Sequence, residues 1–460
     1  MFRRSIFPLM LLVGLCVSNS AVSMPAVERV VLPNQLVMLT SEDHSLPFVT
    51  FQLLLNAGSW RDPEGQEGLA YLTAKALLLG TSNRTAEVIH EELDFMGASL
   101  GASVTKDYAE VSLRVLKKDL EKGFALFMEV LTSPSFPDQE IRREIEKTVA
   151  AIRSAEDQPD DVAQRHFERI LFAGSPYGHP VYGTKESVSK LGREEVHRFF
   201  KTYYHPNHAH LTIVGDIGPA ELKEKILPRL EAWPRGTLPE GRFQVRFQES
   251  AQMVKIDRNL TQATILIGHK GVERANPDYY ALTVMNYILG GGGFSSRLVE
   301  EIRNKRGLAY SVASYFSPGK FPGSFEVSLQ TKNSSAKEAI SIVLAEIERM
   351  RKEGVSDQEL EAAKKYLIGS FPMRFNTQAK LAHFLSQVEY YGLGLDYPEK
   401  YASLIRSVTR DEVLRVARTY LHPEKLIQII VGNLKEANLK EAAVEQGTDK
   451  NRKPLYSPLI

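Results

Sequence analysis

The sequence contains a single cysteine, Cys16, among its 460 residues. One cysteine excludes a disulfide framework, a Cys-based zinc ribbon and a thioredoxin-type pair. An excess of charge of one sign is also lacking, because 57 Lys and Arg stand against 56 Asp and Glu and the formal net charge is +1. Such a balance gives no general attraction for nucleic acid or anionic lipid. No internal stretch approaches the ~20 apolar residues of a membrane-spanning helix. We therefore expect no nucleic-acid partner and no transmembrane segment.

The first 23 residues have the pattern of a secretory signal peptide. Arg3 and Arg4 form a positively charged N-terminal region, and an apolar stretch follows at 6–17. The small residues of 21–23 fit a cleavage site directly after them. We expect residues 1–23 to be removed and the protein to be exported, to a bacterial periplasm.

Two alternatives to a cleaved signal peptide remain. A membrane anchor is disfavoured because the apolar stretch is short and the polar residues 18–20 follow it. A lipoprotein anchored through Cys16 is disfavoured because Leu15 stands where lipidation needs a small residue. Export of the cleaved chain remains the main expectation.

The rest of the chain is an internal duplication. Matching pieces recur at an offset of 216 or 217 residues: 193–196 with 410–413, 205–206 with 422–423, 214–215 with 431–432, and 110–113 with 326–329. Two pieces so far apart that share one offset indicate two similar halves. The expected organisation is a signal peptide at 1–23, an N-terminal domain at 24–232, a Pro- and Gly-rich linker at 233–246, a C-terminal domain at 247–444 and a polar tail at 445–460.

Within each half, strand-like stretches come before long helical ones. Residues 49–55 and 110–115 have the length and the apolar pattern of strands, and residues 120–131 and 139–153 have helical spacing. Such segregation predicts an α+β fold, in which each half is a mostly antiparallel sheet with helices on one face.

A set of residues that matches the motif of one protein family surrounds the helical stretch that begins near residue 69. Its matching positions are Ala57, Gly58, Ser59, Pro63, Gly65, Gly68, Leu69, Ala70, Leu77, Gly80 and Thr81. In this frame the chain resembles the M16 (pitrilysin-like, insulinase-like) zinc peptidases, whose helix carries an inverted H-x-x-E-H motif. The resemblance implies two zinc-binding histidines on one helix face, with the glutamate as general base beside the metal-bound water.

This sequence departs from the motif at each reactive position. Tyr71 and Lys75 stand for the two histidines and Ala74 for the glutamate, while Ala150 and Ala151 occupy the family's third-ligand region. Zinc needs at least three protein ligands, and an alanine methyl group supplies none. The Lys75 ammonium would also repel a dication. We therefore expect no metal, no catalytic residue and no cofactor in this chain, and no peptide hydrolysis by the family mechanism.

The second half keeps a different family feature. Residues 289–298 (LGGGGFSSRL) and 301–312 (EIRNKRGLAYSV) resemble the C-terminal half of two-domain M16 proteins. The resemblance implies two homologous M16-type (LuxS/metallopeptidase-like) domains that close like a clam. It also implies an Arg and a Tyr that bind the substrate backbone, at positions matching Arg303 and Tyr310. A guanidinium and a phenol both donate to a carbonyl oxygen that gains negative charge. The alternative is that both side chains only pack.

The resemblance gives two hypotheses of different class. In the first, the chain is the non-catalytic subunit of an exported M16-type zinc metallopeptidase heterodimer. Its partner would be a homologous M16 subunit with an intact H-x-x-E-H motif and the zinc ion, and its substrate a peptide or unfolded protein. This chain would contribute Arg303, Tyr310 and half of the peptide chamber. In the second, it is a non-proteolytic peptide-binding or scaffold protein with the same fold.

Two further patterns suggest weaker alternatives. Residues 97–101 fit the G-x-S-x-G nucleophile elbow, but helix-like sequence precedes them and strand-like sequence follows, which reverses the order that the elbow needs. His205, His208 and His210 form a candidate metal cluster, but the recurrence of 205–206 at 422–423 is typical of a structural turn. An independent hydrolase with a displaced site therefore ranks below both hypotheses.

Overall fold

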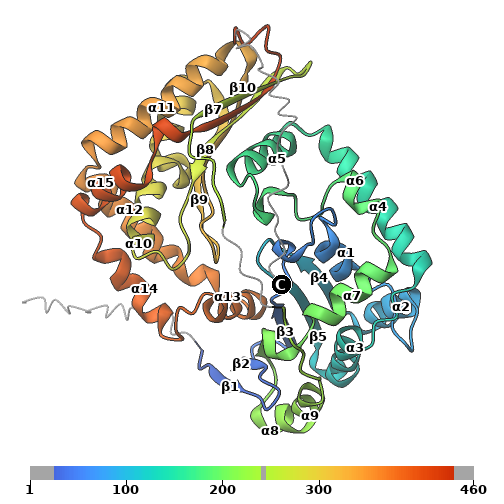
Figure 1. Ribbon diagram of the computed structural model, residues 1–460. Helices are drawn as coiled ribbons and strands as arrows, with labels where there is room; N and C mark the ends of the chain where they lie inside the picture. The colour runs from blue at the N-terminus through green and yellow to red at the C-terminus, as the bar shows by residue number, and fades with distance from the viewer. Residues whose placement is uncertain (1–24, 240–244, 440–460) are drawn as a thin grey trace, which may run out of the picture.

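The apolar strand-like stretches of the sequence form two β-sheets, one in each half of the chain (Figure 1). The computed structural model describes residues 25–239 and 245–439. The expected signal peptide at 1–23 and the expected tail at 445–460 lie outside the described residues. Helices pack on both sheets, and the predicted α+β fold with two similar domains is confirmed.

The N-terminal sheet has six strands: β1 (Glu28–Val31), β2 (Val37–Glu42), β3 (Phe48–Leu55), β4 (Ser99–Val104), β5 (Ala109–Leu116) and β6 (Ala209–Gly215). Their spatial order is β1-β2-β6-β3-β5-β4. Only β2 and β6 run parallel, while the other neighbours are antiparallel. The central strands β3 and β6 are buried along nearly their whole length, which shows that both faces of the sheet are covered.

The C-terminal sheet repeats this arrangement with five strands: β7 (Gln252–Asp257), β8 (Gln262–Lys270), β9 (Ala309–Ser317), β10 (Ser324–Lys332) and β11 (Ile427–Gly432). Their order, β7-β11-β8-β10-β9, corresponds strand by strand to β2-β6-β3-β5-β4. The parallel pair also recurs, as β7 with β11. The duplication read from the sequence is therefore a duplication of topology.

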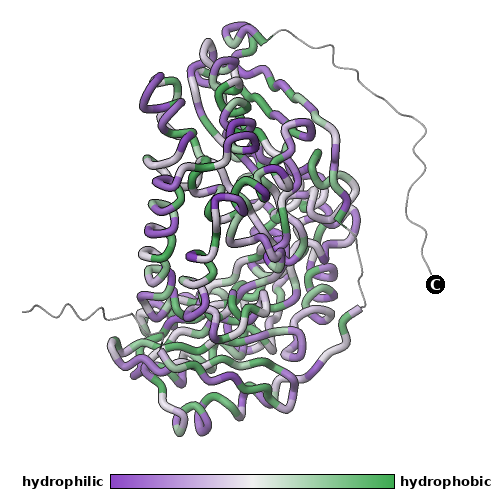
Figure 2. The backbone as a smooth tube through the Cα atoms, turned by 90° about the vertical axis from the view of Figure 1, so that its left-hand side faces the viewer, coloured by the Kyte–Doolittle hydropathy of each residue, from purple (hydrophilic) through white to green (hydrophobic). Residues whose placement is uncertain are grey.

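The helices of the N-terminal half are α1 (Leu69–Ala76), α2 (Ala86–Met96), α3 (Leu120–Thr132), α4 (Asp138–Glu156), α5 (Pro159–Leu171), α6 (Lys185–Val188), α7 (Arg193–Tyr203), α8 (Pro219–Glu221) and α9 (Leu227–Glu231). Those of the C-terminal half are α10 (Tyr279–Asn286), α11 (Ala336–Glu353), α12 (Asp357–Ser370), α13 (Gln378–Tyr390), α14 (Tyr397–Arg406) and α15 (Arg410–Tyr420). Hydrophilic and hydrophobic residues alternate along many of these helices, as expected for helices with one buried face (Figure 2).

Local sequence explains several helix boundaries. Thr85 accepts a hydrogen bond from the backbone N–H of Val88 at the start of α2, and Gly97 ends that helix in the left-handed region at φ 58°. The strand β4 follows directly, so helix precedes strand around residues 97–101 and the order is opposite to that of a nucleophile elbow. In the matching pair α7 and α15, an acidic side chain in the first turn accepts the backbone N–H that precedes each helix.

One helix of each half packs on the sheet of the other half. Helix α5 packs against β8 and β11 of the C-terminal sheet, and α13 packs against β3 and β6 of the N-terminal sheet. Apolar residues of α5 and the segment after it share a core with the C-terminal sheet: Val162, Ala163, Phe167, Leu171, Phe172 and Tyr177 with Leu266, Ile427, Ile429 and Val431. Each sheet is thus covered on one face by its own helices and on the other by a helix from the opposite half. The sequence did not predict this exchange.

Polar contacts also hold α13 on the N-terminal sheet. His210 Nε2 donates to the carbonyl oxygen of Ser386 at 3.0 Å, and the Ser386 hydroxyl donates to Thr212 at 2.8 Å. Burial lowers the pKa of His210 to about 4, so its imidazole is neutral at pH 7. The contact between the halves therefore contains directional bonds as well as apolar packing.

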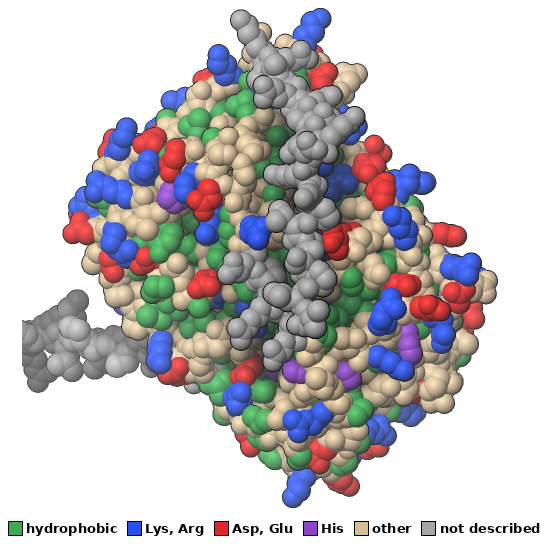
Figure 3. All heavy atoms as spheres, viewed as in Figure 1, with side chains coloured by type: hydrophobic (Ala, Val, Ile, Leu, Met, Phe, Trp, Pro, Cys, Tyr) green, Lys and Arg blue, Asp and Glu red, His purple; other side chains and the backbone are tan. Residues whose placement is uncertain are grey.

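The surface is mixed in charge. Lys and Arg side chains are interspersed with Asp and Glu over the face seen in Figure 3. Within the described part of the chain, no helix combines the length and the apolar character needed to cross a membrane.

Candidate functional site

Helix α1 carries three of the substituted motif positions, and its start is held by Asp62. The two carboxylate oxygens of Asp62 accept hydrogen bonds from the backbone N–H groups of Gly68 and Ala70, both at 2.7 Å. Gly68 has φ 95°, and a Cβ atom there would lie 2.7 Å from the carbonyl oxygen of Tyr182. Glycine is therefore required at this turn, and the helix begins in a fixed direction.

The side chains of α1 do not fit a zinc ion. Ala74 is buried and presents a methyl group where a general base would be needed. Tyr71 and Lys75 lie one turn apart and half buried, with the Lys75 Nζ 5.4 Å from the centroid of the Tyr71 ring. This is a cation–π arrangement, which directs the ammonium toward the phenol. A phenol, a methyl group and an ammonium do not form the N, O and S ligand set that zinc takes in proteins.

Helix α4 packs against α1 and brings a second group of positions to the same region. Ala150 and Ala151 are exposed on α4 and offer no ligand atom. Glu144, two turns earlier, has a largely buried side chain. The pKa of the Tyr71 phenol is raised, mainly by burial and further by the Glu144 carboxylate. Sequence reasoning missed Glu144, although its spacing of seven residues from Ala151 places both on one face of α4.

The candidate histidine cluster has three separate environments. His205 Nε2 donates to a carbonyl oxygen of α7 at 2.8 Å, and His208 Nε2 accepts from the neighbouring Asn207 amide at 2.9 Å. His210 is buried against α13 through Ser386. In the part of the chain that the structure describes, no group of three or more His, Cys, Asp or Glu side chains is arranged to hold a metal ion.

Arg303 and Tyr310 lie together in the C-terminal half. Arg303 is on a π-helical segment, Val299–Asn304, and Tyr310 is the second residue of β9. The Arg303 guanidinium carbon lies 4.5 Å from the Tyr310 ring centroid and 4.6 Å from that of Phe294. Both rings are open to solvent, with exposed fractions of 83% for Tyr310 and 72% for Phe294. Sequence reasoning had placed Phe294 in the motif without giving it a role.

The guanidinium of Arg303 is left free to bind a ligand. Among the described residues, no hydrogen bond or ion pair engages its N–H groups, and its contacts are the two aromatic rings. The two rings lie within cation–π distance of the guanidinium, and such contacts do not use its N–H donors. This set of Phe294, Arg303 and Tyr310 is called the arginine clamp below.

The glycine-rich stretch before Phe294 is shaped by close packing. A Cβ atom on Gly290 would lie 2.6 Å from the hydroxyl of Ser314, and Gly293 adopts φ 56°. The Ser314 hydroxyl in turn donates to the Asn286 side chain at 2.8 Å. The glycines therefore allow the chain to turn tightly against β9 and to present Phe294.

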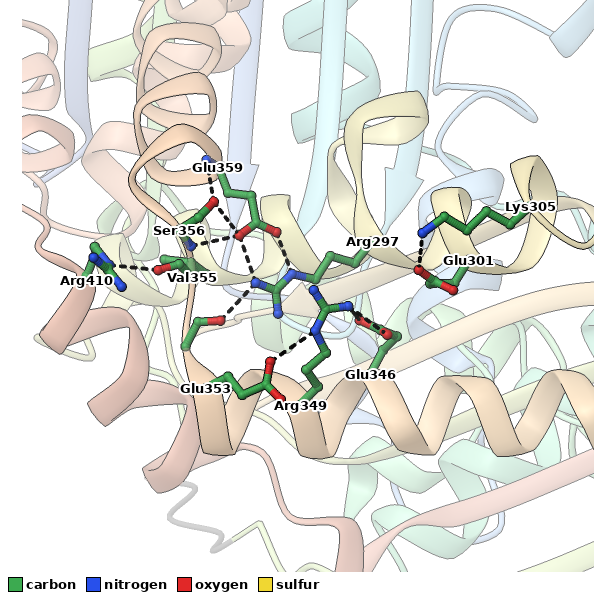
Figure 4. Close-up of polar contacts among 11 residues, drawn as sticks. Arg297, Glu301, Lys305, Glu346, Arg349, Glu353, Val355, Ser356, Glu359 and Arg410 are labelled. Atoms are coloured by element: carbon green, nitrogen blue, oxygen red, sulfur yellow. Dashed lines mark hydrogen bonds and ion pairs between the residues drawn. The ribbon is translucent and has the colours of Figure 1, made fainter.

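A partly buried ion pair anchors the segment between the glycines and Arg303 (Figure 4). Arg297 donates to both carboxylate oxygens of Glu359 at 2.6 and 2.8 Å, and to the carbonyl oxygen of Gly354 at 2.9 Å. Ser356 also donates to Glu359 and caps α12. Burial alone would raise the pKa of Glu359, but the hydrogen bonds from Arg297 and Ser356 lower it to about 2. The pair fixes the chain just before the π-helical segment of Arg303.

The structure thus forms two groups of the predicted site residues. Tyr71, Ala74 and Lys75 share α1 and lie beside α4, and Arg303 and Tyr310 lie in the arginine clamp. No hydrogen bond, ion pair or ring contact among the described residues links one group to the other. The chain presents a polar wall without zinc ligands in one half and an available arginine in the other.

These features define a two-domain protein of the M16 type whose zinc helix has lost its ligands. Family models agree: residues 37–185 match the insulinase (peptidase family M16) model, and residues 190–367 match the peptidase M16 inactive domain. The chain belongs to the M16 peptidase family, and it is a non-catalytic member of that family.

Relatives cover nearly the whole chain. An uncharacterized zinc protease of Rickettsia bellii is 27% identical over 90% of this chain and 93% of its own length. The non-peptidase homolog YmxG of Helicobacter pylori is 26% identical over 87% of this chain and 92% of its own length. The crystal structure of a peptidase M16 inactive domain from Pseudomonas fluorescens superposes with a TM-score of 0.84 at 27% identity, covering 88% of this chain and 98% of that chain.

Proposed function

We propose that this protein is the non-catalytic, substrate-binding subunit of an exported M16-type zinc metallopeptidase heterodimer. The observation that carries the proposal is the arginine clamp, in which the guanidinium carbon of Arg303 lies 4.5 and 4.6 Å from the centroids of two exposed rings and has no polar partner among the described residues. The zinc ion and its H-x-x-E-H motif would belong to a homologous partner subunit. The similarity to a protein named a non-peptidase homolog supports the division of roles.

The arginine clamp is suited to the backbone of an extended peptide. The edge of the Arg303 guanidinium offers paired N–H donors that match carbonyl oxygens, and the Tyr310 hydroxyl offers another donor. Because the rings of Phe294 and Tyr310 restrict the guanidinium, less conformational entropy is lost when a peptide binds. The same donors would stabilise a carbonyl oxygen that becomes negatively charged while the partner subunit attacks the peptide bond.

The N-terminal half would act as a wall of the chamber. Tyr71, Lys75 and Glu144 supply polar groups there, but none of them forms a zinc site. The proposed export rests on the signal-peptide pattern of residues 1–23.

Native mass spectrometry of the protein, purified gently from its own host, tests the heterodimer. We expect an equimolar complex of about twice the 51.6 kDa mass of this chain, with a second chain of similar size and one zinc ion. A monomer or a homodimer without zinc would contradict the proposal and would favour the non-proteolytic peptide-binding or scaffold role.

Substitution of Arg303 tests the substrate-binding role. Arg303→Ala should lower the kcat/KM of the complex for an unfolded peptide about tenfold or more, because it removes the free donors. Arg303→Lys should restore only part of the activity, since an ammonium does not offer the planar pair of donors. Arg406→Ala is the matched control, because Arg406 is also exposed and has no ion pair among the described residues. Equal activity of the Arg303 and Arg406 variants would show that Arg303 only packs.

A further inference from the structure

A cavity of about 690 Å³ lies where α5, the end of α4 and the segment before α6 meet a residue of the opposite half. Figure 1 shows α4, α5 and α6 grouped at one side of the N-terminal sheet, with α5 turned toward the C-terminal half. The size falls within the roughly 300–1,000 Å³ of ligand-binding pockets. Its only lining residue from the C-terminal half, within the described chain, is Arg258, which follows β7.

Four permanently charged cations line this cavity: Arg165, Arg169, Lys185 and Arg258. Arg165 lies 3.8 Å from the Glu156 carboxylate, a long ion-pair distance. Among the described residues, the other three cations have no carboxylate within ion-pair distance. Arg165 and Arg169 are four residues apart on α5, so they project from the same face of the helix.

His166 on the same helix adds no charge of its own. Arg169 donates to His166 Nδ1 at 3.0 Å, and an arginine can only donate, so this ring nitrogen is an acceptor. Burial lowers the pKa of His166, and the charges of Arg169 and Arg165 lower it further. The contact therefore holds Arg169 in place and leaves its full positive charge uncompensated.

The acidic residues of the lining only partly offset the cations. Glu67, Glu156 and Glu186 are its three carboxylates, against four cations. Glu67 accepts the backbone N–H of Gly65 at 3.0 Å, and Glu156 faces Arg165. A carboxylate from outside would thus meet several cations without a partner.

The remaining lining indicates the kind of molecule that brings the carboxylate. Ile152, Val162 and Pro180 give the cavity apolar wall, which suits a peptide better than a free inorganic anion. Ile152 follows Ala151 on α4, and Glu67 precedes α1, so the cavity borders the chamber wall described above. We propose that this cavity binds carboxylates of the peptide substrate, either Asp and Glu side chains or the terminal carboxylate. The choice of a peptide rests on the proposed function.

Fluorescence anisotropy with labelled, unstructured peptides and the purified full chain tests this site. The first peptide carries a run of glutamates, and the second has glutamines in their place. Each is made with a free and with an amidated C-terminus. The glutamate peptide should bind about tenfold more tightly than the glutamine peptide, and the difference should shrink as salt is raised. If the terminal carboxylate is the ligand instead, the two peptides with free ends should bind equally, and amidation should weaken the binding of both.

Two variants separate this site from the arginine clamp. Lys185→Glu combined with Arg169→Gln should abolish the preference for glutamate and leave the affinity for the glutamine peptide unchanged. Lys122→Glu is the matched control, because Lys122 is an exposed helical lysine without an ion pair among the described residues. Equal binding of all four peptides to the unaltered chain, with free or amidated ends, would overturn the carboxylate site and leave the peptide-binding role intact. Failure of both peptides to bind would overturn the peptide-binding role and this inference with it.

Discussion

The two halves of this protein use one topology for different purposes. Helix α1 packs against α4, α7 and β4, and α10 packs against the corresponding elements α12, α15 and β9. In the N-terminal half the equivalent helix carries Tyr71, Ala74 and Lys75 in place of zinc ligands. In the C-terminal half the helix is followed by glycines that lead to the arginine clamp. The framework of an M16 domain therefore persists when its metal chemistry is lost, because the sheet and helix packing do not depend on the zinc ligands.

Restoring the metal site tests whether the N-terminal framework can still hold zinc. Tyr71→His and Lys75→His, combined with Glu at Ala150 or at Ala151, should convert α1 and α4 into a site that binds one zinc ion per chain. Two imidazoles at i and i+4 and a carboxylate from the packed helix α4 make a three-ligand set. Zinc content measured by inductively coupled plasma mass spectrometry checks the result.

A parallel variant controls for surface histidines. His substituted at two exposed positions of α2 with the same spacing, such as Glu87 and Glu91, should add no zinc that survives dialysis. If the redesigned α1 folds and still takes no zinc, the substituted positions do not lie where the family resemblance places them.

A substitution in α5 tests whether the two halves unfold as separate units. Phe167 of α5 is fully buried against the C-terminal sheet, so Phe167→Ala should cost about 3–5 kcal/mol of unfolding free energy. Trp233 is buried in the N-terminal core, and Trp60 packs against the core that the two halves share. Because the halves share this core, the urea transitions followed by tryptophan fluorescence and by far-UV circular dichroism should shift together. A circular dichroism transition that separates from an unmoved fluorescence transition would show independent halves.

The anchor of the arginine clamp should make the C-terminal half sensitive to acid. The folded pKa of Glu359 is about 2, below its ordinary 4.5, so its ion pair with Arg297 stabilises the fold above pH 4.5 and loses this effect as the pH falls toward 2. Glu359→Gln should cost about 3 kcal/mol at pH 7 and should lose less stability than the unaltered chain on acidification. Urea unfolding at pH 7 and pH 3 measures both. Glu361→Gln, on the exposed side of α12, should change neither.

A smaller effect is expected where α13 covers the N-terminal sheet. The pKa of His210 is about 4 in the fold, below its ordinary 6.5, so the neutral imidazole stabilises the contact fully above pH 6.5 and progressively less down to pH 4. His210→Gln retains a donor for Ser386. Between pH 7 and pH 4.5, the unfolding free energy of this variant should fall by about 2 kcal/mol less than that of the unaltered chain. An unchanged pH slope in urea unfolding would contradict this assignment.

Much of the fold could be predicted because it depends on local sequence patterns. The expected helical stretches at 120–131 and 139–153 lie within the observed bounds of α3 and α4, and α7 and α15 begin and end at positions 217 residues apart. The motif frame likewise located α1, Arg303 and Tyr310, since spacing along the chain fixes their order. These features need only neighbours in sequence or one repeated offset.

The features that were missed depend on contacts between distant segments. The exchange of α5 and α13 brings together residues that are hundreds of positions apart in the sequence. The sequence of an amphipathic helix shows which face is buried but not which sheet that face covers. Phe294 gains its role only because the glycines fold it onto Arg303. The cavity beside α5 depends on Arg258, which arrives from the other half.

The exchange of α5 and α13 also bears on how such a molecule arose. Each helix follows the corresponding element of its own half and covers the corresponding strands of the other half, so the exchange is reciprocal. Two separate chains that swap one helix through a two-fold axis form a closed homodimer with this geometry. The present protein has the form of such a dimer with both copies in one chain. Because both copies lie in one chain, the two halves can carry different side chains at equivalent places, as α1 and the arginine clamp do.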